Sequence, residues 1–157
     1  MGRSRGGLTT KIHHAVDGKG RPLAILVTGG QRNDGAMLVQ ADISVPRLGR
    51  GRARTRPDAV IADRAYSTGV IRNELRRRRI TAVIPAKSDH LAALKRRGSA
   101  GGRPHAFDAE IYKDRNVVER SFNKAKQWRG LATRYDKLAI TYRAAVAIFA
   151  ILTWLRT

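Results

Sequence analysis

Two acidic residues, Asp63 and Glu119, have the side-chain type and the setting for metal-ion chemistry. Asp63 directly follows an apolar run at residues 59–62, and Glu119 lies in a stretch without glycine or proline. A carboxylate at the end of a strand and one on a later, packed helix can converge on a hard cation, which prefers oxygen ligands. Two Mg²⁺ ions about 4 Å apart can activate an attacking oxygen and stabilise a leaving oxygen in phosphoryl transfer. The two acids therefore indicate phosphoryl-transfer chemistry.

Basic residues greatly outnumber the acids in this chain. Its 157 residues include 32 Lys and Arg against 12 Asp and Glu, a formal net charge of +20, and the cations are spread along the whole length. Such a charge opposes compaction by self-repulsion, and its commonest use is to neutralise nucleic-acid phosphates with release of counterions. An Arg-rich composition without a function is the alternative. Composition therefore favours a nucleic-acid partner, with Lys and Arg holding phosphates around the acids.

Composition also excludes several kinds of site. The chain has no cysteine, so it has no disulfide, thiolate zinc site or cysteine nucleophile. Its four histidines are too scattered to indicate a metal site. The amino terminus lacks the apolar stretch of a secretory signal, and apolar residues 144–155 are too few for a bilayer span of about 20 residues. We expect a cytoplasmic, nucleoid-associated protein without a membrane role.

Upstream of the two acids, the pattern predicts a β-hairpin. Apolar residues alternate with polar ones over residues 8–16, and residues 23–27 form a short apolar run. Between them, Asp17-Gly-Lys-Gly-Arg21 has the composition of a turn, because glycine adopts positive φ at little cost. Beyond the hairpin we expect a loop at residues 28–34, a short helix at residues 36–43 and an exposed, Arg-rich connection at residues 46–57.

Around Asp63 the pattern predicts a strand, a helix and a second strand. Residues 59–62 and 81–85 are short apolar runs, and residues 70–79 form a basic amphipathic segment between them. This order and spacing are typical of a parallel crossover unit. Residues 88–107, with three Gly and a basic cluster, indicate a short helix and a flexible loop. Asp63 is therefore expected at the carboxyl end of a buried parallel strand.

Glu119 is expected on one long helix over residues 111–128, preceded by a cap near Asp108. At about 100° per residue, four side chains of this helix share a stripe of about 60°, namely Tyr112, Arg115, Glu119 and Lys126. The stripe alone is more typical of a solvated face with an Arg115–Glu119 ion pair, and Asp63 at the end of an apolar strand is what favours a metal site. A last helix, roughly residues 137–155, is apolar on nearly every side and should be buried against the sheet or a partner.

The spacing of these four residues resembles a known signature. Tyr112, two residues, Arg115, three residues, Glu119, six residues and Lys126 match the Tyr-Arg-Glu-Lys signature of bacterial insertion-sequence DDE transposases. Ala62-Asp-Arg-Ala-Tyr66 is similar to the segment that carries the second aspartate of that family. The hairpin and the loop after it also resemble the family. The resemblance therefore covers nearly the whole chain and is specific, because four residue types stand at three fixed gaps.

This resemblance implies an α/β, ribonuclease H-like fold, a mixed sheet with flanking helices, as a single partial catalytic domain over residues 1–157. It implies that Asp63 and Glu119 are the second and third members of an Asp-Asp-Glu triad that holds Mg²⁺ or Mn²⁺. The supporting residues expected on DNA are Arg64, Tyr112, Arg115 and Lys126. The partners implied are transposon ends and target DNA.

The chain departs from the family pattern at the first aspartate. That residue belongs to a strand before the hairpin, where only Gly, Arg and Ser follow Met1. Asp17 and Asp34 are the nearest acids, but one lies in the hairpin turn and the other in the following loop. We therefore expect a carboxyl-terminal portion that lacks the first catalytic strand, as a second-frame product or a decayed remnant. It would form a homo-oligomer or pair with an upstream-frame transposase product.

Three functional hypotheses follow. The first is an enzyme region that performs metal-dependent DNA cleavage and strand transfer at insertion-sequence ends, with the activity of this portion alone left open. The second is a catalytically inactive DNA-binding remnant or inhibitor. The third is an unrelated basic nucleic-acid-binding or ribosome-associated protein. Metal-dependent nicking of DNA, and its dependence on Asp63 and Glu119, distinguish the three.

Overall fold

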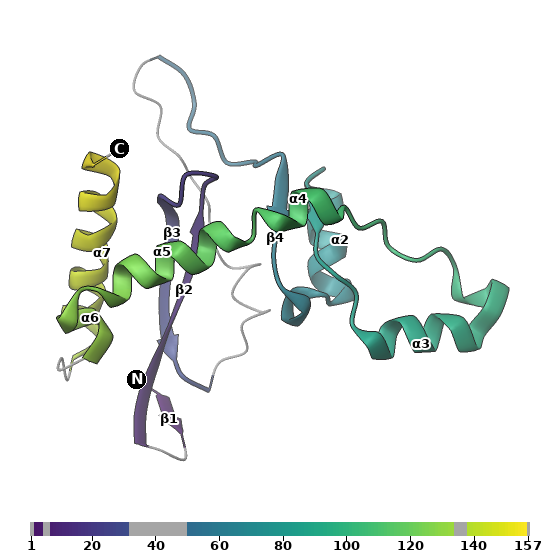
Figure 1. Cartoon of the computed structure of the whole chain (residues 1–157), viewed down its shortest axis with the longest axis horizontal. Coiled ribbons are helices and arrows are strands. Elements are labelled where there is room, and N and C mark those ends of the chain that lie inside the picture. Colours follow the sequence, from purple (N-terminus) through teal and green to yellow (C-terminus); the bar gives the residue numbers. More distant parts are fainter. Residues whose placement is uncertain (1, 5–6, 32–49, 134–137, 157) are drawn as a thin grey trace. The chain divides into compact units, whose positions relative to one another are not determined.

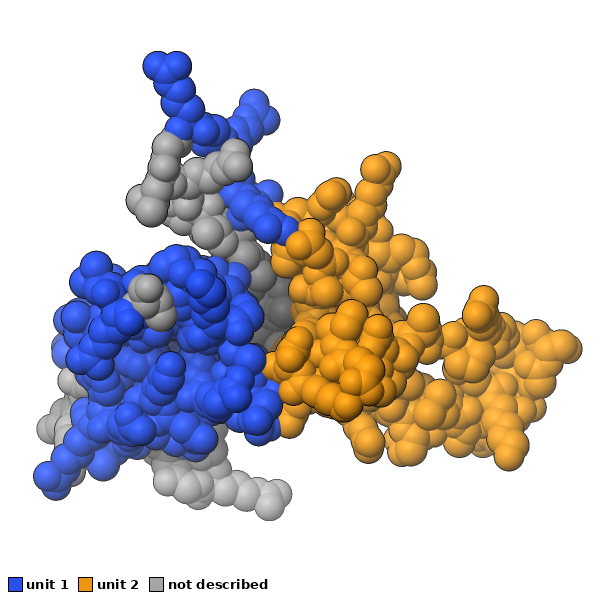
Figure 2. All heavy atoms as spheres, turned by 45° about the horizontal axis from the view of Figure 1, so that its top comes forward, with its two compact units in different colours: residues 1–55, 116–157 blue, residues 56–115 orange. Residues whose placement is uncertain are grey.

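The computed structural model describes residues 2–4, 7–31, 50–133 and 138–156. Contacts divide the chain into two units, residues 1–55 with residues 116–157, and residues 56–115 (Figure 2). Each unit has its own small sheet and its own helices. The expected helix at residues 36–43 lies outside the described residues, as do residues 32–34 of the expected loop, with Asp34, and residues 46–49 of the expected connection.

The first unit is built on the predicted hairpin. Strands β2 (Gly7–Val16) and β3 (Pro22–Gly29) are antiparallel, with His13 opposite Leu26 and His14 opposite Ile25. A short strand, β1 (Gly2–Ser4), pairs with residues 7–9 of β2 and was not expected. The hairpin prediction is therefore confirmed, and the strands extend beyond the residues that the sequence pattern marked.

Three helices cover this sheet: α5 (Asn116–Lys126), α6 (Arg129–Thr133) and α7 (Ala139–Leu155). In Figure 1, α5 crosses β2 and α7 runs beside β3, in agreement with the contacts between these elements. The core is a cluster of side chains from α6 and α7, namely Leu131, Tyr142, Val146 and Phe149. Partly buried residues of the hairpin and α5 pack against it, and the Tyr142 hydroxyl donates to the Leu131 carbonyl at 3.2 Å. The sheet and the last helix thus share one core.

Helix α7 buries one face and leaves the other exposed. The prediction that it packs against the sheet is confirmed by its contacts with β3. Its outer side nevertheless keeps several apolar residues exposed, among them Ile140, Ile148, Ile151 and Leu155. The near-continuous apolar sequence therefore marks a helix with two apolar faces, of which the sheet covers one.

The second unit contains the predicted crossover around Asp63. Strands β4 (Ala59–Ile61) and β5 (Thr81–Val83) are parallel, and they are joined through the 3-10 helix η1 (Arg64–Tyr66) and α2 (Gly69–Arg77). The Thr68 hydroxyl caps α2 by accepting from the Ile71 N–H at 3.4 Å. Buried Ile71 and Leu75 place the apolar stripe of α2 towards β5. Strand, helix and parallel strand are therefore confirmed.

The rest of the second unit consists of short helices: α3 (Ser88–Arg97), the 3-10 helix η2 (Gly98–Gly101) and α4 (Ala109–Lys113). The predicted cap at Asp108 is confirmed, because its Oδ1 accepts from the N–H groups of Glu110 and Ile111. The chain is therefore mixed α/β with small sheets and flanking helices, which is compatible with a ribonuclease H-like fold.

Candidate functional site

Asp63 lies two residues beyond β4, so its predicted place after the strand is confirmed. Its side chain caps η1, with Oδ1 accepting from the Ala65 N–H at 2.8 Å. Among the described residues, the second carboxylate oxygen, Oδ2, has no hydrogen-bond partner. The cap fixes the direction of the half-buried carboxylate, and Oδ2 stays available to a cation. Arg64, the next residue, is exposed on η1.

A buried arginine braces the segment that follows Asp63. Arg72 on α2 donates from Nη2 to the Ser67 hydroxyl at 3.1 Å and to the Ile84 carbonyl at 2.6 Å. Ser67 follows η1 and Ile84 follows β5, so one guanidinium ties both loops to α2. We did not predict this role. The available signal was the position of Arg72 next to buried Ile71 and one turn before Leu75, on the inward side of the helix.

The four signature residues do not share one continuous helix, so that prediction was wrong. Tyr112 lies in α4, Glu119 and Lys126 lie in α5, and Arg115 lies in the turn between these helices. The Arg115 N–H bonds the Tyr112 carbonyl at 3.0 Å, a three-residue spacing in place of the four of an α-helix. Asp114 and Asn116 flank Arg115, and short polar side chains of this kind compete with helical backbone bonding.

The four signature residues divide into two pairs, one in each unit. In the second unit, the Arg115 guanidinium lies over the Tyr112 ring, 5.9 Å from its centroid, and the Phe107 ring meets Tyr112 edge-on at 5.2 Å. In the first unit, Glu119 and Lys126 are both exposed on α5, and their spacing of seven residues places them on one helix face. Asp63 belongs to the second unit and Glu119 to the first.

Helix α5 is anchored to the hairpin by its opposite side. The buried Ser121 hydroxyl donates to the Gly20 carbonyl at 3.1 Å. The Phe122 ring stacks on the His14 ring, with centroids 4.1 Å apart and planes at 11°. Partly buried Trp128, beyond the end of α5, meets Phe149 edge-on at 5.8 Å. These contacts direct Glu119 and Lys126 outward, and Trp128 packs against the core.

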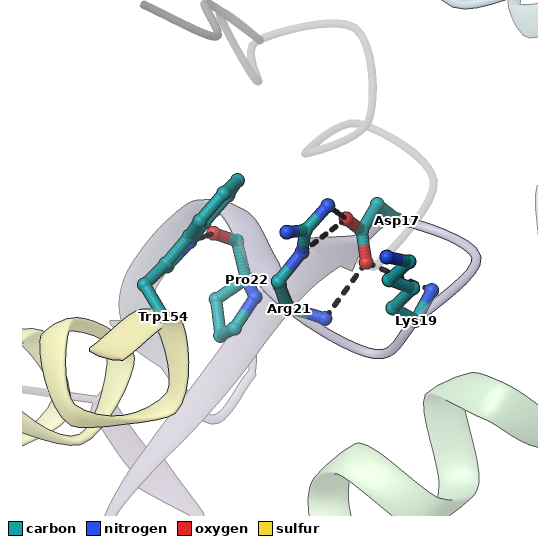
Figure 3. Close-up of polar contacts among 5 residues, drawn as sticks. All are labelled: Asp17, Lys19, Arg21, Pro22 and Trp154. Carbon is teal, nitrogen blue, oxygen red and sulfur yellow. Dashed lines mark hydrogen bonds and ion pairs between the residues drawn. The ribbon is translucent and has the colours of Figure 1, made fainter. Parts of the chain in front are cut away.

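Asp17 is committed to the hairpin turn (Figure 3). Its Oδ1 accepts from the N–H groups of Lys19 and Arg21, both at 2.9 Å, and its Oδ2 pairs with the Arg21 guanidinium at 2.6 Å. Burial alone would raise the pKa of Asp17, but the bonds from Arg21 and Lys19 outweigh it and lower that pKa. Both oxygens are therefore used in the turn, so Asp17 does not take the place of the first family aspartate.

Arg21 also connects the turn to the last helix. Its guanidinium lies 4.3 Å from the ring centroid of Trp154, and the Trp154 indole N–H donates to the Pro22 carbonyl at 2.8 Å (Figure 3). Trp154 thus has a structural partner on each side.

Within the described ranges, no three histidine, aspartate or glutamate side chains form a group that fits a metal ion. None of the helices in the same ranges is both long enough and apolar enough to cross a membrane.

Comparison with known proteins places the chain in a family. Residues 2–154 match the family described as "Transposase DDE domain". A protein of Brucella ovis assigned as the transposase for insertion sequence element IS6501 is 29% identical over 149 residues, 95% of this chain and 100% of that protein. A protein of Burkholderia cepacia assigned as the transposase for element IS402 is 33% identical over 132 residues. That match covers 83% of this chain and 55% of the relative, so the chain spans little more than half of it.

No solved structure gives a significant match. The family match nevertheless runs through both units and includes Asp63 and all four signature residues. Members of this family generally perform polynucleotidyl transfer with divalent metal ions. The chain belongs to the transposase DDE domain family.

Proposed function

We propose that this chain is the catalytic portion of an insertion-sequence transposase that cleaves and rejoins phosphodiester bonds at the ends of its element. The observation that carries the proposal is the placement of Asp63 after a parallel strand, with one oxygen in a cap and the other unpartnered among the described residues. The Tyr-Arg-Glu-Lys spacing supports it. The family match accounts for the positive charge, so the hypothesis of an unrelated basic nucleic-acid-binding protein is dropped.

Asp63 and Glu119 are the proposed ligands of Mg²⁺ or Mn²⁺. Their donor atoms fit these hard cations, because carboxylate oxygens are the preferred protein ligands of both. Bound metal would supply charge neutralisation at the reacting phosphate. The chain's own contribution is orientation, because the Ala65 N–H holds one carboxylate and the anchored α5 carries the other.

The cations of the signature are proposed to bind DNA. Arg64 adjoins Asp63 on the exposed side of η1, and Lys126 shares a face of α5 with Glu119. Each would hold a backbone phosphate beside a carboxylate, which fixes the scissile bond without reading its sequence. The Tyr112 ring lies under the Arg115 guanidinium and would keep it oriented towards a phosphate.

The two units are proposed to be parts of one ribonuclease H-like domain. Strand β1 covers only residues 7–9 of β2, and in the described part of the chain no strand pairs with that edge over residues 10–16. An open edge favours pairing with another strand. We propose that an upstream-frame transposase product pairs with this edge and supplies the first acid of the triad, and a second copy of this chain is the alternative partner of the edge.

A DNA-binding remnant or inhibitor is the second candidate. It is favoured by the residues before the hairpin turn, because none of residues 1–16 is acidic. Such a protein would compete for insertion-sequence ends without cutting them. The two candidates therefore differ in cleavage and agree in binding.

The test is nicking of a supercoiled plasmid carrying the element's ends by the full chain, alone and together with the upstream-frame product, with and without Mg²⁺ or Mn²⁺. We expect metal-dependent nicking that Asp63→Asn and Glu119→Gln reduce to background. Asp89→Asn, an exposed acid in the first turn of α3, is the matched control and should nick normally. DNA binding without nicking would establish the remnant instead, and nicking that survives both active-site variants would contradict the assignment of the ligands.

A further inference from the structure

The second unit contains an open crevice rich in cations, here called the arginine crevice. Its volume is about 310 Å³, and its walls include Arg72, Arg76, Arg79, Ile80, Thr81 and His105. No acidic side chain of the described residues lines it. Water occupies about 30 Å³ per molecule in the liquid, so the crevice has room for a phosphate group with attached atoms.

Arg72 reaches this crevice with hydrogen-bonding capacity to spare. The residue is only 6% exposed, and both of its side-chain hydrogen bonds leave from Nη2, towards Ser67 and Ile84. Its Nε is enclosed and its Nη1 is not, and neither nitrogen has a hydrogen-bond partner among the described residues, so Nη1 is the donor that an anion can reach. A buried donor left unsatisfied is costly, so a guanidinium with bonds on one nitrogen alone is suited to an anion that uses another.

Arg79 occupies a backbone position that favours glycine. Its φ is +56°, the only positive value among the described residues other than glycine. The position ends α2 in a Schellman motif, with the Ile80 N–H on the Leu75 carbonyl at 2.8 Å and the Arg79 N–H on the Arg76 carbonyl at 2.9 Å. An arginine kept where glycine fits better indicates a use for its side chain.

The crowding of positive charge also affects His105. Partial burial lowers the pKa of His105, and the nearby Arg72, Arg76 and His90 lower it further. Cations near a helix carboxyl end interact favourably with the helix dipole, and this alone would explain Arg76. The helix dipole does not explain why Arg79 has a positive φ or why Arg72 has donors that make no hydrogen bond. Neither feature is needed for an interaction with the dipole.

We infer that the arginine crevice binds a phosphate group of the DNA backbone, outside the carboxylate site. An open crevice suits a group that projects from a polymer, because small-molecule sites bury most of their ligand. The +20 charge of the chain favours the same source. The inference rests on the proposed function, since it names a second place where the bound DNA is held.

The test compares the affinity of the full chain and its variants for a short DNA duplex at several salt concentrations. Arg79→Gly removes one cation and fits the backbone, and Arg76→Gln removes another without changing the helix. Both should bind DNA several-fold more weakly, with the slope of log affinity against log salt reduced by about one. Arg97→Gln, in the last turn of α3 and outside the crevice, removes the same charge and should change affinity less.

A titration with inorganic phosphate separates the two sources of phosphate, with the His105 ring resonances as the readout. DNA should shift these resonances in the wild-type chain and much less in Arg79→Gly. If phosphate shifts them but DNA does not, the crevice is a free-phosphate site and the inference is wrong. If the variants bind DNA as tightly as the wild type, the inference also fails, although the proposed function stands. A wild-type chain that binds no DNA would overturn the proposed function itself.

Discussion

His14 is a histidine that the fold keeps uncharged. It lies on β2, stacks on Phe122 of α5, and has a buried Nε2 without a hydrogen-bond partner among the described residues. Burial lowers the pKa of His14 from 6.5 to about 4. Between these values the unfolded chain binds a proton that the folded chain excludes. The free energy of unfolding should therefore be highest above pH 6.5 and fall as the pH is lowered towards 4.

Over that pH interval we predict that the free energy of unfolding falls by at most about 3 kcal/mol because of His14. His14→Phe keeps a ring against Phe122 and removes the titrating group, so its stability should depend less on pH. Urea unfolding of both proteins at about pH 7.5 and about pH 5 provides the measurement. An equal loss of stability in the variant would show that other groups cause the effect.

Arg79 gives a prediction about stability that is independent of ligands. An L-residue in the left-handed region costs about 1 to 2 kcal/mol, and glycine avoids this cost at the end of a helix. Arg79→Gly should therefore raise the free energy of unfolding by about 1 kcal/mol. Arg79→Ala removes the same side chain and keeps the strain, so it should not stabilise the protein. Equal effects of the two variants in urea unfolding would contradict the backbone explanation.

At the scale of the element, the hairpin turn depends on one of its two glycines. Gly20 has a φ of +81°, and its carbonyl accepts the hydrogen bond from Ser121 that anchors α5. Gly18 does not have a positive φ, and a Cβ there would meet nothing within 4 Å. Gly20→Ala should cost about 1 to 2 kcal/mol of stability, and Gly18→Ala should be nearly neutral. Similar stabilities of the two variants in urea unfolding would count against a specific role of Gly20.

Elements set by local patterns were predictable from the sequence. The alternation from Leu8 to Val16 and the glycines of the turn marked the hairpin, and two apolar runs around a basic amphipathic segment marked the crossover. The position of Asp63 followed from the end of its strand. Each of these features depends on residues that are neighbours in the sequence.

Other features depend on interactions that the hydrophobic periodicity of the sequence does not reveal. The absence of Gly and Pro from residues 111–128 predicted one helix, but the backbone turns at Arg115 between Asp114 and Asn116. The burial of Arg72 arises from carbonyl and hydroxyl partners that only the fold supplies. The sharing of a metal by Asp63 and Glu119 joins residues of two units and remains a proposal.

At the scale of the whole molecule, the charge of +20 predicts strongly salt-dependent DNA binding. Proteins that neutralise 6 to 10 phosphates lose about three to five powers of ten in affinity between about 50 mM and about 200 mM salt. We expect the slope of log affinity against log salt concentration to be steeper than about −4 for a duplex of any sequence. Counterion release, which drives this binding, does not depend on the sequence. Fluorescence anisotropy across this range measures the slope. Affinity that does not change with salt would show that the charge serves another purpose.

Asp63 and Glu119 are proposed to hold the same divalent metal ion. Iron-directed cleavage of the polypeptide tests this proposal most directly, because Fe²⁺ bound in place of Mg²⁺, with peroxide and ascorbate, cuts the backbone next to its ligands. We predict cuts beside both Asp63 and Glu119 in the DNA-bound full chain, suppressed by excess Mg²⁺ and lost at both places in Asp63→Asn. Cleavage at one of these residues that persists when the other is replaced would contradict a shared metal site.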